Sequence, residues 1–134
     1  MDLGESVEDY LESIWVLSLK NGEDNVRSVD IARMMNFSKP SVCIAVKGLC
    51  KKRLLEKDEV GFLHLTEKGK SLATQVYERH RFLADCLVDM GVSRATAEKD
   101  ACRIEHYLSA ESYEAIVNSF NLLANPSEPA FAER

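Results

Sequence analysis

Apolar positions recur with the period of an α-helix in six segments of the chain. Their spacing of three and four residues predicts helices over about residues 7–20, 29–35, 39–53, 67–90, 94–108 and 110–123. Ser6 followed by Asp9 has the spacing of a capping box. Hydroxyl side chains ahead of the later segments are candidate N-caps: Ser28, Ser38, Thr66, Ser93 and Ser109. The pattern therefore predicts a mainly α-helical fold.

Residues 26–65 have the pattern of a DNA-reading unit. The second and third helices are joined by a three-residue turn, and Pro40 stands in the first turn of the third, an arrangement typical of a helix-turn-helix. Two short apolar strands around a turn at residues 59–61 predict a hairpin, the wing of a winged helix. Residues 26–29 are expected to be a short extended or capping segment. We predict a winged helix-turn-helix domain over residues 1–70 and a helical domain over 71–134, with regular structure ending at about 125–129.

Charge is distributed unevenly along the chain. The net charge is −5, which alone argues against a nucleic-acid partner. Residues 33–57, however, contain seven basic residues and one acidic residue, whereas residues 71–134 contain six basic and ten acidic residues. A basic module joined to an acidic one is typical of a DNA-binding domain attached to a dimerisation or sensor domain.

Nothing in the sequence predicts export or membrane insertion. No apolar run approaches the roughly 20 residues that cross a bilayer, and the N-terminus is acidic, unlike a signal peptide. The four cysteines, Cys43, Cys50, Cys86 and Cys102, form no CxxC pair. We therefore expect a cytoplasmic protein with reduced thiols and no membrane partner.

Cys102, Glu105 and His106 form the most informative chemical motif. Positions i, i+3 and i+4 share one helix face, about 5–6 Å apart at Cβ, so a thiolate, a carboxylate and an imidazole can approach one metal ion. In the first helix, Asp9 and Glu12 are also three residues apart. Carboxylates crowded together repel one another, and a divalent cation reverses that repulsion. The two helices are therefore candidate sources of metal ligands.

Several blocks of the sequence, taken in order, resemble the diphtheria toxin repressor family of metal-dependent transcriptional regulators. They are residues 6–14 (SVEDYLESI), the helix-turn-helix, the step Leu65-Thr66-x-x-Gly69, residues 79–81 (RHR) and residues 100–106 (DACRIEH), so that the resemblance covers about residues 6–124. It implies a winged helix that reads an operator, helices that form a homodimer, and a metal ion between the two domains. It also implies six metal ligands: Asp9, Glu12, His80, Cys102, Glu105 and His106.

The resemblance leaves the metal open between two branches of the family. Without an SH3-like third domain, the architecture is similar to the shorter manganese regulators, and Asp9 follows that branch. Cys102 departs from it, because the manganese type usually has a glutamate there and the iron type a cysteine. Glu98 stands where some relatives use a histidine for a second site, and Ala84 offers no ligand, so a complete second site is not expected. We expect Mn²⁺ or Fe²⁺ as the cofactor, with Zn²⁺ or Co²⁺ able to substitute in vitro.

The start of the third helix is the candidate DNA-reading surface. The N-terminal turn of such a helix enters the major groove, and lysines further along it meet phosphates. Ile44 places an apolar side chain on the same reading face. The candidate DNA contacts are Ser38, Lys39, Pro40, Ser41, Lys47 and Lys51.

The predicted function is a metal-dependent repressor. The homodimer is expected to bind double-stranded operator DNA when Mn²⁺ or Fe²⁺ is bound, and to control metal-ion uptake genes. One alternative is a thiol-redox-sensing winged-helix repressor that uses Cys43 and Cys50, seven residues apart on the third helix. An enzyme acting on a small organic substrate is not expected, because the sequence has no nucleophile elbow, no HExxH and no phosphate loop.

Overall fold

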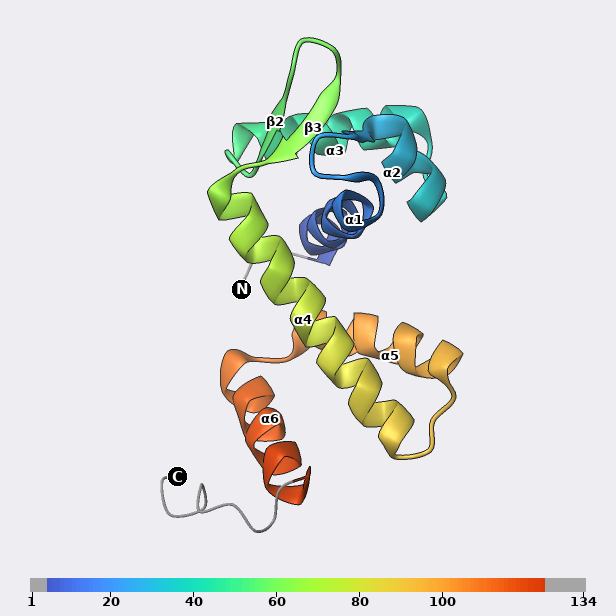
Figure 1. Ribbon diagram of the computed structural model, residues 1–134, viewed down its shortest axis with the longest axis vertical. Helices are drawn as coiled ribbons and strands as arrows, with labels where there is room; N and C mark the ends of the chain where they lie inside the picture. Colours follow the sequence, from blue (N-terminus) through green and yellow to red (C-terminus); the bar gives the residue numbers. More distant parts are fainter. Residues whose placement is uncertain (1–4, 125–134) are drawn as a thin grey trace. The chain divides into compact units, whose positions relative to one another are not determined.

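Three helices and a small sheet form the first part of the molecule (Figure 1). The computed structural model describes residues 5–124. The helices are α1 (Glu5–Asn21), α2 (Ser28–Met35) and α3 (Lys39–Lys51), and the strands are β1 (Val26–Arg27), β2 (Leu55–Lys57) and β3 (Phe62–Leu65). Buried apolar side chains from all of these elements share one core, among them Leu11, Val26, Ile31, Val42, Leu55 and Leu63. The predicted winged helix-turn-helix is confirmed.

Only some of the predicted N-caps are found in the structure. Ser38 caps α3, because its Oγ accepts a hydrogen bond from the Ser41 backbone N–H at 3.3 Å. The assignment of Ser28 as a cap is wrong: Arg27 is the N-cap of α2, and its backbone N–H donates to Asp30 Oδ2 at 2.9 Å. The Ser6 cap is also wrong, because α1 is already helical at Glu5.

The wing is a three-stranded antiparallel sheet in the order β1-β3-β2. The predicted hairpin pairs Leu55 of β2 with Leu65 of β3. Its turn is closed by Asp58 Oδ1, which accepts hydrogen bonds from the backbone N–H groups of Val60, Gly61 and Phe62. β1 pairs with the other edge of β3. The first half of the segment predicted as extended or capping, residues 26–29, is therefore a strand, whereas Ser28 and Val29 already belong to α2.

A close backbone approach joins the wing to the next helix, α4 (Glu67–Asp89). The Thr66 hydroxyl donates to the Arg53 carbonyl at 2.7 Å and accepts from the Gly69 N–H at 3.0 Å. Gly69 is buried, and a Cβ built on it would clash with the Leu54 carbonyl oxygen. The Leu65-Thr66-x-x-Gly69 step of the sequence is therefore a packing requirement: only glycine lets α4 start against the backbone of Leu54, just before β2.

The helices α5 (Arg94–Tyr107) and α6 (Ala110–Ala124) complete the fold with the second half of α4. Leu83 and Ala84 pack on Ala101, with Phe82 and Leu108 at the edge of this smaller core. The buried Arg79 ties the three helices together, because its Nη2 donates to the Leu108 carbonyl at 2.7 Å and its guanidinium lies over the Tyr113 ring. Ser93 caps α5 by accepting from the Thr96 N–H, as predicted.

The contacts within the chain divide it into two units, Met1–Glu78 and Arg79–Arg134. The expected mainly α-helical architecture is confirmed in both. Among the described residues, no helix is both long and apolar enough to cross a bilayer. The predicted end of regular structure at residues 125–129 lies outside the described residues.

Candidate metal centre and nucleic-acid interface

Three of the six predicted metal ligands come together within the C-terminal unit. His80 stands on α4, and Cys102 and Glu105 stand one turn apart on α5. The donor atoms of these three side chains all lie within 4.8 Å of one another. Ligand atoms about 2.0–2.3 Å from a shared ion are about 3–4.5 Å apart. Small side-chain adjustments would therefore let the three hold one ion.

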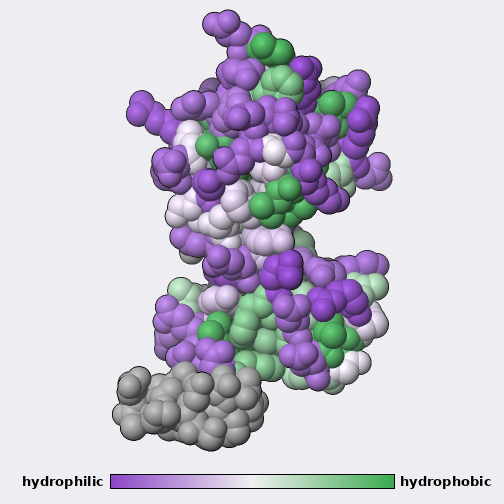
Figure 2. All heavy atoms as spheres, in the orientation of Figure 1, coloured by the Kyte–Doolittle hydropathy of each residue, from purple (hydrophilic) through white to green (hydrophobic). Residues whose placement is uncertain are grey.

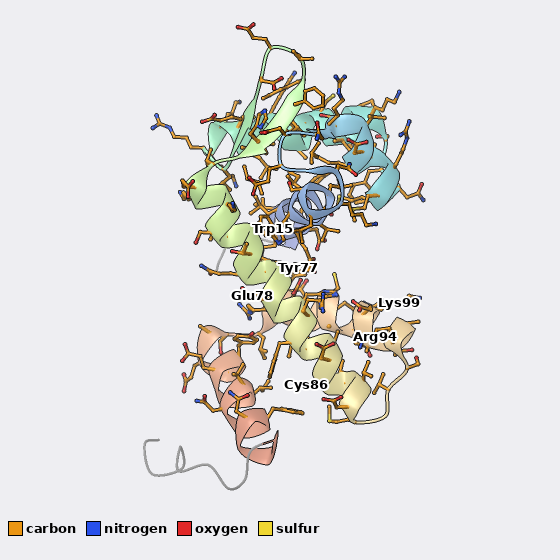
Figure 3. All side chains as sticks on the ribbon, viewed as in Figure 1. Trp15, Tyr77, Glu78, Cys86, Arg94 and Lys99 are labelled. Atoms are coloured by element: carbon orange, nitrogen blue, oxygen red, sulfur yellow. The ribbon has the colours of Figure 1, made fainter. Side chains whose placement is uncertain are left out.

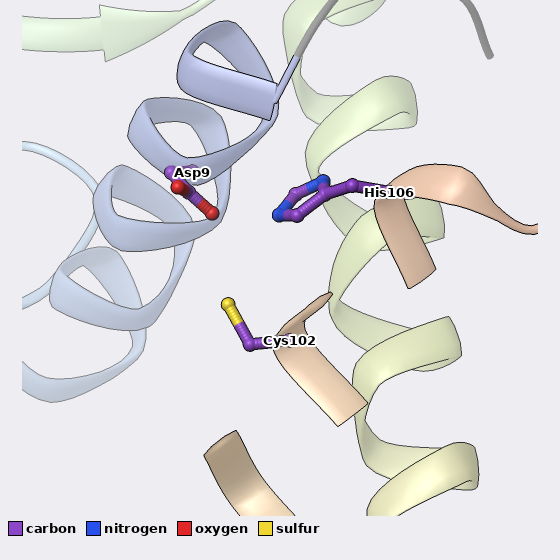
Figure 4. Close-up of side chains that lie close together, drawn as sticks. All are labelled: Asp9, Cys102 and His106. Carbon is purple, nitrogen blue, oxygen red and sulfur yellow. The ribbon is translucent and has the colours of Figure 1, made fainter. Parts of the chain in front are cut away.

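Glu105 lies at the centre of this group. It is only 4 % exposed. Its Oε1 is 3.9 Å from His80 Nδ1 and 3.7 Å from His106 Nε2. A carboxylate held away from water needs nearby positive charge, which either imidazolium ions or a metal cation can supply. Cys102 and His106, both labelled in Figure 4, belong to α5, where their i, i+4 spacing places them on one face of the helix.

The structure gives His80 a partner that the sequence did not reveal. His80 Nε2 lies 2.6 Å from Glu98 Oε2, so one ring nitrogen faces Glu98 and the other faces Glu105. Glu98 is noticeable in the sequence because it lies one turn before Cys102 on α5. Its contact with His80 depends on how α4 and α5 pack together, which periodicity does not determine.

Asp9 and Glu12 lie in the N-terminal unit, one turn apart on α1 and both half-buried. Figure 4 shows Asp9 on this helix. The ordinary explanation for an aspartate at this spacing after a serine is helix capping. Because α1 is already helical at Glu5, Asp9 is not the N3 residue of a Ser6 cap. Structural capping therefore does not explain the acidic pair.

All six candidate DNA contacts are exposed: five lie on α3, and Ser38 is its N-cap. Val42, Val46 and Leu49 turn the opposite side of this helix into the core. Ile44 is 73 % exposed between the two groups of polar side chains. The visible face of the N-terminal unit is mainly hydrophilic with isolated apolar side chains (Figure 2). The exposed candidate contacts are Ser38, Lys39, Pro40, Ser41, Lys47 and Lys51.

The alternative of a redox switch at Cys43 and Cys50 is not favoured. Residues seven apart in a helix are separated by about 10.5 Å at Cα, whereas a disulfide needs about 4.4–6.8 Å. Burial also raises the pKa of the Cys50 thiol, which makes it a poorer nucleophile at neutral pH. An intramolecular bond between these thiols would require α3 to unwind.

Both parts of the chain match one family of proteins. Residues 2–59 match the family described as iron dependent repressor, N-terminal DNA binding domain. Residues 66–127 match the family described as iron dependent repressor, metal binding and dimerisation domain. The transcriptional regulator MntR of Escherichia coli O157:H7 is 35 % identical over 111 residues, covering 83 % of this chain and 70 % of that protein. The HTH-type transcriptional regulator MntR of Geobacillus kaustophilus is 33 % identical over 111 residues, covering 83 % and 77 %.

Solved structures agree with the sequence relatives. The manganese regulator SloR has a TM-score of 0.75 at 30 % identity, covering 86 % of this chain. The T. acidophilum IdeR structure has a TM-score of 0.72 at 29 % identity, covering 85 %. This chain spans 53 % of the length of each of these two proteins. The named relatives are transcriptional regulators and not enzymes, as expected. The chain therefore belongs to the iron-dependent repressor family, also called the diphtheria toxin repressor family of metal-dependent transcriptional regulators.

Proposed function

We propose that this protein is a homodimeric repressor that binds operator DNA when Mn²⁺ or Fe²⁺ is bound, and that it controls metal-ion uptake genes. The observation that carries the proposal is the convergence of His80, Cys102 and Glu105 in the unit that matches the metal-binding and dimerisation family. The other unit presents a basic, exposed helix in a winged helix-turn-helix. A sensor and a DNA reader are thus carried by one chain.

The proposed ligand set joins residues from both units. Asp9 and Glu12 on α1 would add two carboxylates to the donors on α4 and α5. A bound divalent cation supplies the positive charge that makes the approach of these carboxylates to Glu105 favourable. Asp9 and Glu12 would then hold α1, and with it the core that supports α3, at a fixed place relative to the dimerisation helices. The six proposed ligands are Asp9, Glu12, His80, Cys102, Glu105 and His106.

The donor types narrow the choice of metal. Carboxylates and imidazoles suit Mn²⁺ and Fe²⁺, whereas the Cys102 thiolate adds preference for softer ions such as Fe²⁺, Co²⁺ and Zn²⁺. Relatives carry both associations in their names, as a manganese regulator and as iron-dependent repressors. We propose Mn²⁺ or Fe²⁺ in the cell, with Zn²⁺ and Co²⁺ as substitutes in vitro.

The proposed DNA contacts divide into two kinds. Lys39, Pro40 and Ser41 at the start of α3 would meet base edges, and Lys47 and Lys51 would meet phosphates. Ser38 caps α3, so it would contribute to DNA recognition by fixing the direction of the first turn of that helix. Ile44 fits an apolar contact with a thymine methyl group.

Metal would act on DNA binding by fixing the distance between the two recognition helices of the dimer. These helices must match half-sites about one helical turn, or a multiple of it, apart. Coupling between two ligands of one protein is typically about 1–3 kcal/mol, or roughly 5–150-fold in affinity. Two sites in a symmetric dimer would multiply that effect.

The test uses Glu12→Ala and His106→Ala, with Lys99→Gln on α5 as the control. Binding to a labelled fragment of the upstream DNA is measured with metal and with chelator, and dimerisation is followed by sedimentation. Both alanine variants should remain folded dimers and lose most of the metal-dependent gain in DNA affinity, whereas the control should keep it. Full metal response in both alanine variants would contradict the proposed site.

A further inference from the structure

Glu98 makes a short hydrogen bond to His80, one of the proposed ligands. Its Oε2 lies 2.6 Å from His80 Nε2, across the α4–α5 contact. The His80 side chain is 14 % exposed, so water competes little for this bond. We propose that Glu98 is a positioning residue: it fixes the tautomer and orientation of His80 so that Nδ1 is the nitrogen offered to the metal. This inference rests on the function proposed above.

The tautomer follows from the chemistry of the pair. An ionised carboxylate only accepts hydrogen bonds, so the hydrogen that joins His80 to Glu98 is carried by Nε2. A neutral imidazole that carries its hydrogen on Nε2 has its lone pair on Nδ1. Nδ1 is the nitrogen that lies 3.9 Å from Glu105 Oε1, in the group of proposed ligands. Glu98 thus turns the metal-binding lone pair toward the other donors.

Glu98 is itself held in place by a second ion pair. Arg94 Nη1 lies 3.5 Å from Glu98 Oε1 and 3.0 Å from Asp85 Oδ1 on α4. Figure 3 shows Arg94 on α5. Arg94 therefore links the two helices a turn away from His80, and the His80–Glu98 bond links them again. The hydrogen bond between His80 and Glu98 is therefore one of the contacts that pack α4 against α5.

The same carboxylate is poorly placed to be a ligand of the centre. Glu98 is not part of the group formed by His80, Cys102 and Glu105, whose donor atoms all lie within 4.8 Å of one another. A separate site built on His80 and Glu98 would need a further donor on α4, and Ala84, one turn after His80, is buried in the core and has none. Glu98 is 42 % exposed, and two of its contacts are to His80 and Arg94. These contacts favour a role for Glu98 in orienting His80, not in binding the metal.

The experiment combines a measurement on the metal-free protein with one on metal binding. Nitrogen-detected NMR of the histidine rings at about pH 8 gives the His80 tautomer in the intact metal-free chain. Competition titrations with Co²⁺ and Mn²⁺ give metal affinity for the intact chain and for Glu98→Ala, Glu98→Gln and Glu114→Gln. Glutamine keeps an oxygen that can accept the Nε2–H bond but carries no charge, and Glu114 is an exposed carboxylate on α6.

The unchanged chain should carry the His80 hydrogen on Nε2. Glu98→Ala should lose this single tautomer and bind metal about 10–100-fold more weakly, the usual cost of removing a partner that orients a ligand histidine. Glu98→Gln should recover most of the loss, and Glu114→Gln should bind as the unchanged chain does. The inference is overturned if the hydrogen is on Nδ1, if Glu98→Ala binds metal normally, or if Glu98→Gln is as weak as Glu98→Ala. Failure of the unchanged chain to bind either ion would instead contradict the proposed function, and the tautomer would still be measured.

Discussion

His64 is held between two carboxylates in the wing of the N-terminal unit. Its Nε2 lies 2.9 Å from Asp58 Oδ2 in the hairpin turn, and its Nδ1 lies 3.2 Å from Asp24 Oδ1 ahead of β1. The hydrogen bond that His64 donates to Asp58 raises the pKa of His64 above its ordinary 6.5, against a smaller opposing effect of burial. The same bond lowers the pKa of Asp58 from 3.8 to about 2. Protonated His64 therefore forms ion pairs with Asp58 in the hairpin turn and with Asp24 in the segment before β1, and so links these two segments.

The stability of the fold should depend on pH through this pair. Because the pKa of His64 is raised by folding, its contribution to the free energy of unfolding is complete below pH 6.5 and disappears as pH rises through the folded-state pKa. The Asp58 contribution is complete above pH 3.8 and disappears as pH falls toward 2. His64→Gln should therefore lower urea stability at about pH 5 and change it little at about pH 9. An NMR titration that placed the His64 pKa at or below 6.5 would contradict this interpretation.

Cys102 is the proposed ligand that most affects metal choice. Replacing it with glutamate exchanges a soft thiolate for a hard carboxylate, so Cys102→Glu should shift preference from Zn²⁺ and Co²⁺ toward Mn²⁺, by about tenfold or more in the ratio of affinities. Competition titrations measure that ratio. Cys43→Ser, which removes an exposed thiol of the N-terminal unit, is the control and should leave the ratio unchanged. An unchanged ratio in Cys102→Glu would exclude the thiolate as a ligand.

The elements show which features the sequence could predict. Helical periodicity and glycine or serine boundaries located all six helices found in residues 5–124, because these signals are local. The pairing of β1 with β3 was missed, because β1 has two residues and its partner is distant in the sequence. The caps at Ser6 and Ser28 were misplaced because a hydroxyl near a helix start can lie inside the helix instead of at the N-cap position: α1 is already helical at Glu5, and Ser28 is the first residue of α2.

In the candidate metal site, too, contacts within one helix could be predicted from the sequence, whereas contacts between helices could not. Cys102, Glu105 and His106 share one face of one helix, so their proximity follows from spacing alone. The approach of His80 to Glu105 requires a particular rotation of α4 against α5. Side chains that set this rotation, such as Arg94 and Phe82, act between helices. The resemblance to a family supplied His80, whereas the role of Glu98 needed the structure.

The step from the wing into α4 depends on Gly69. In Gly69→Ala the new Cβ meets the Leu54 carbonyl oxygen, so the start of α4 must move, and the free energy of unfolding should fall by about 1–3 kcal/mol. Gly48→Ala is the matched control, because nothing lies within 4 Å of a Cβ at that position inside α3. There, alanine should stabilise the helix by about 0.5–1 kcal/mol. Urea denaturation measures the free energy of unfolding of both variants. Equal changes in the two would contradict the packing argument.

The recognition helix should contribute a salt-dependent part of DNA binding. If Lys47 and Lys51 meet phosphates, replacing either with glutamine should weaken binding to all sequences and reduce the slope of log affinity against log salt by about 1. Lys99→Gln on α5 should leave the slope unchanged. Fluorescence anisotropy over a series of salt concentrations measures it. Unchanged slopes in both α3 variants would place the phosphate contacts elsewhere.

The chain combines a basic DNA-binding unit with an acidic C-terminal unit that has its own core. The net charge of −5 conceals this division, because the basic residues are concentrated between residues 33 and 57. The two family matches fall on the same two parts of the chain. In the proposed mechanism, carboxylates of the reader and donors of the sensor share one ion, so that metal availability is converted into DNA affinity.

Anaerobic titration of the metal-free protein with Mn²⁺, Fe²⁺ and Zn²⁺, read out as binding to a labelled fragment of its own upstream DNA, tests this mechanism. We expect affinity to rise at least about tenfold with Mn²⁺ or Fe²⁺ at micromolar concentration, within the range of ordinary coupling between two sites. Equal DNA affinity with metal and with chelator would contradict the proposal that metal controls DNA binding.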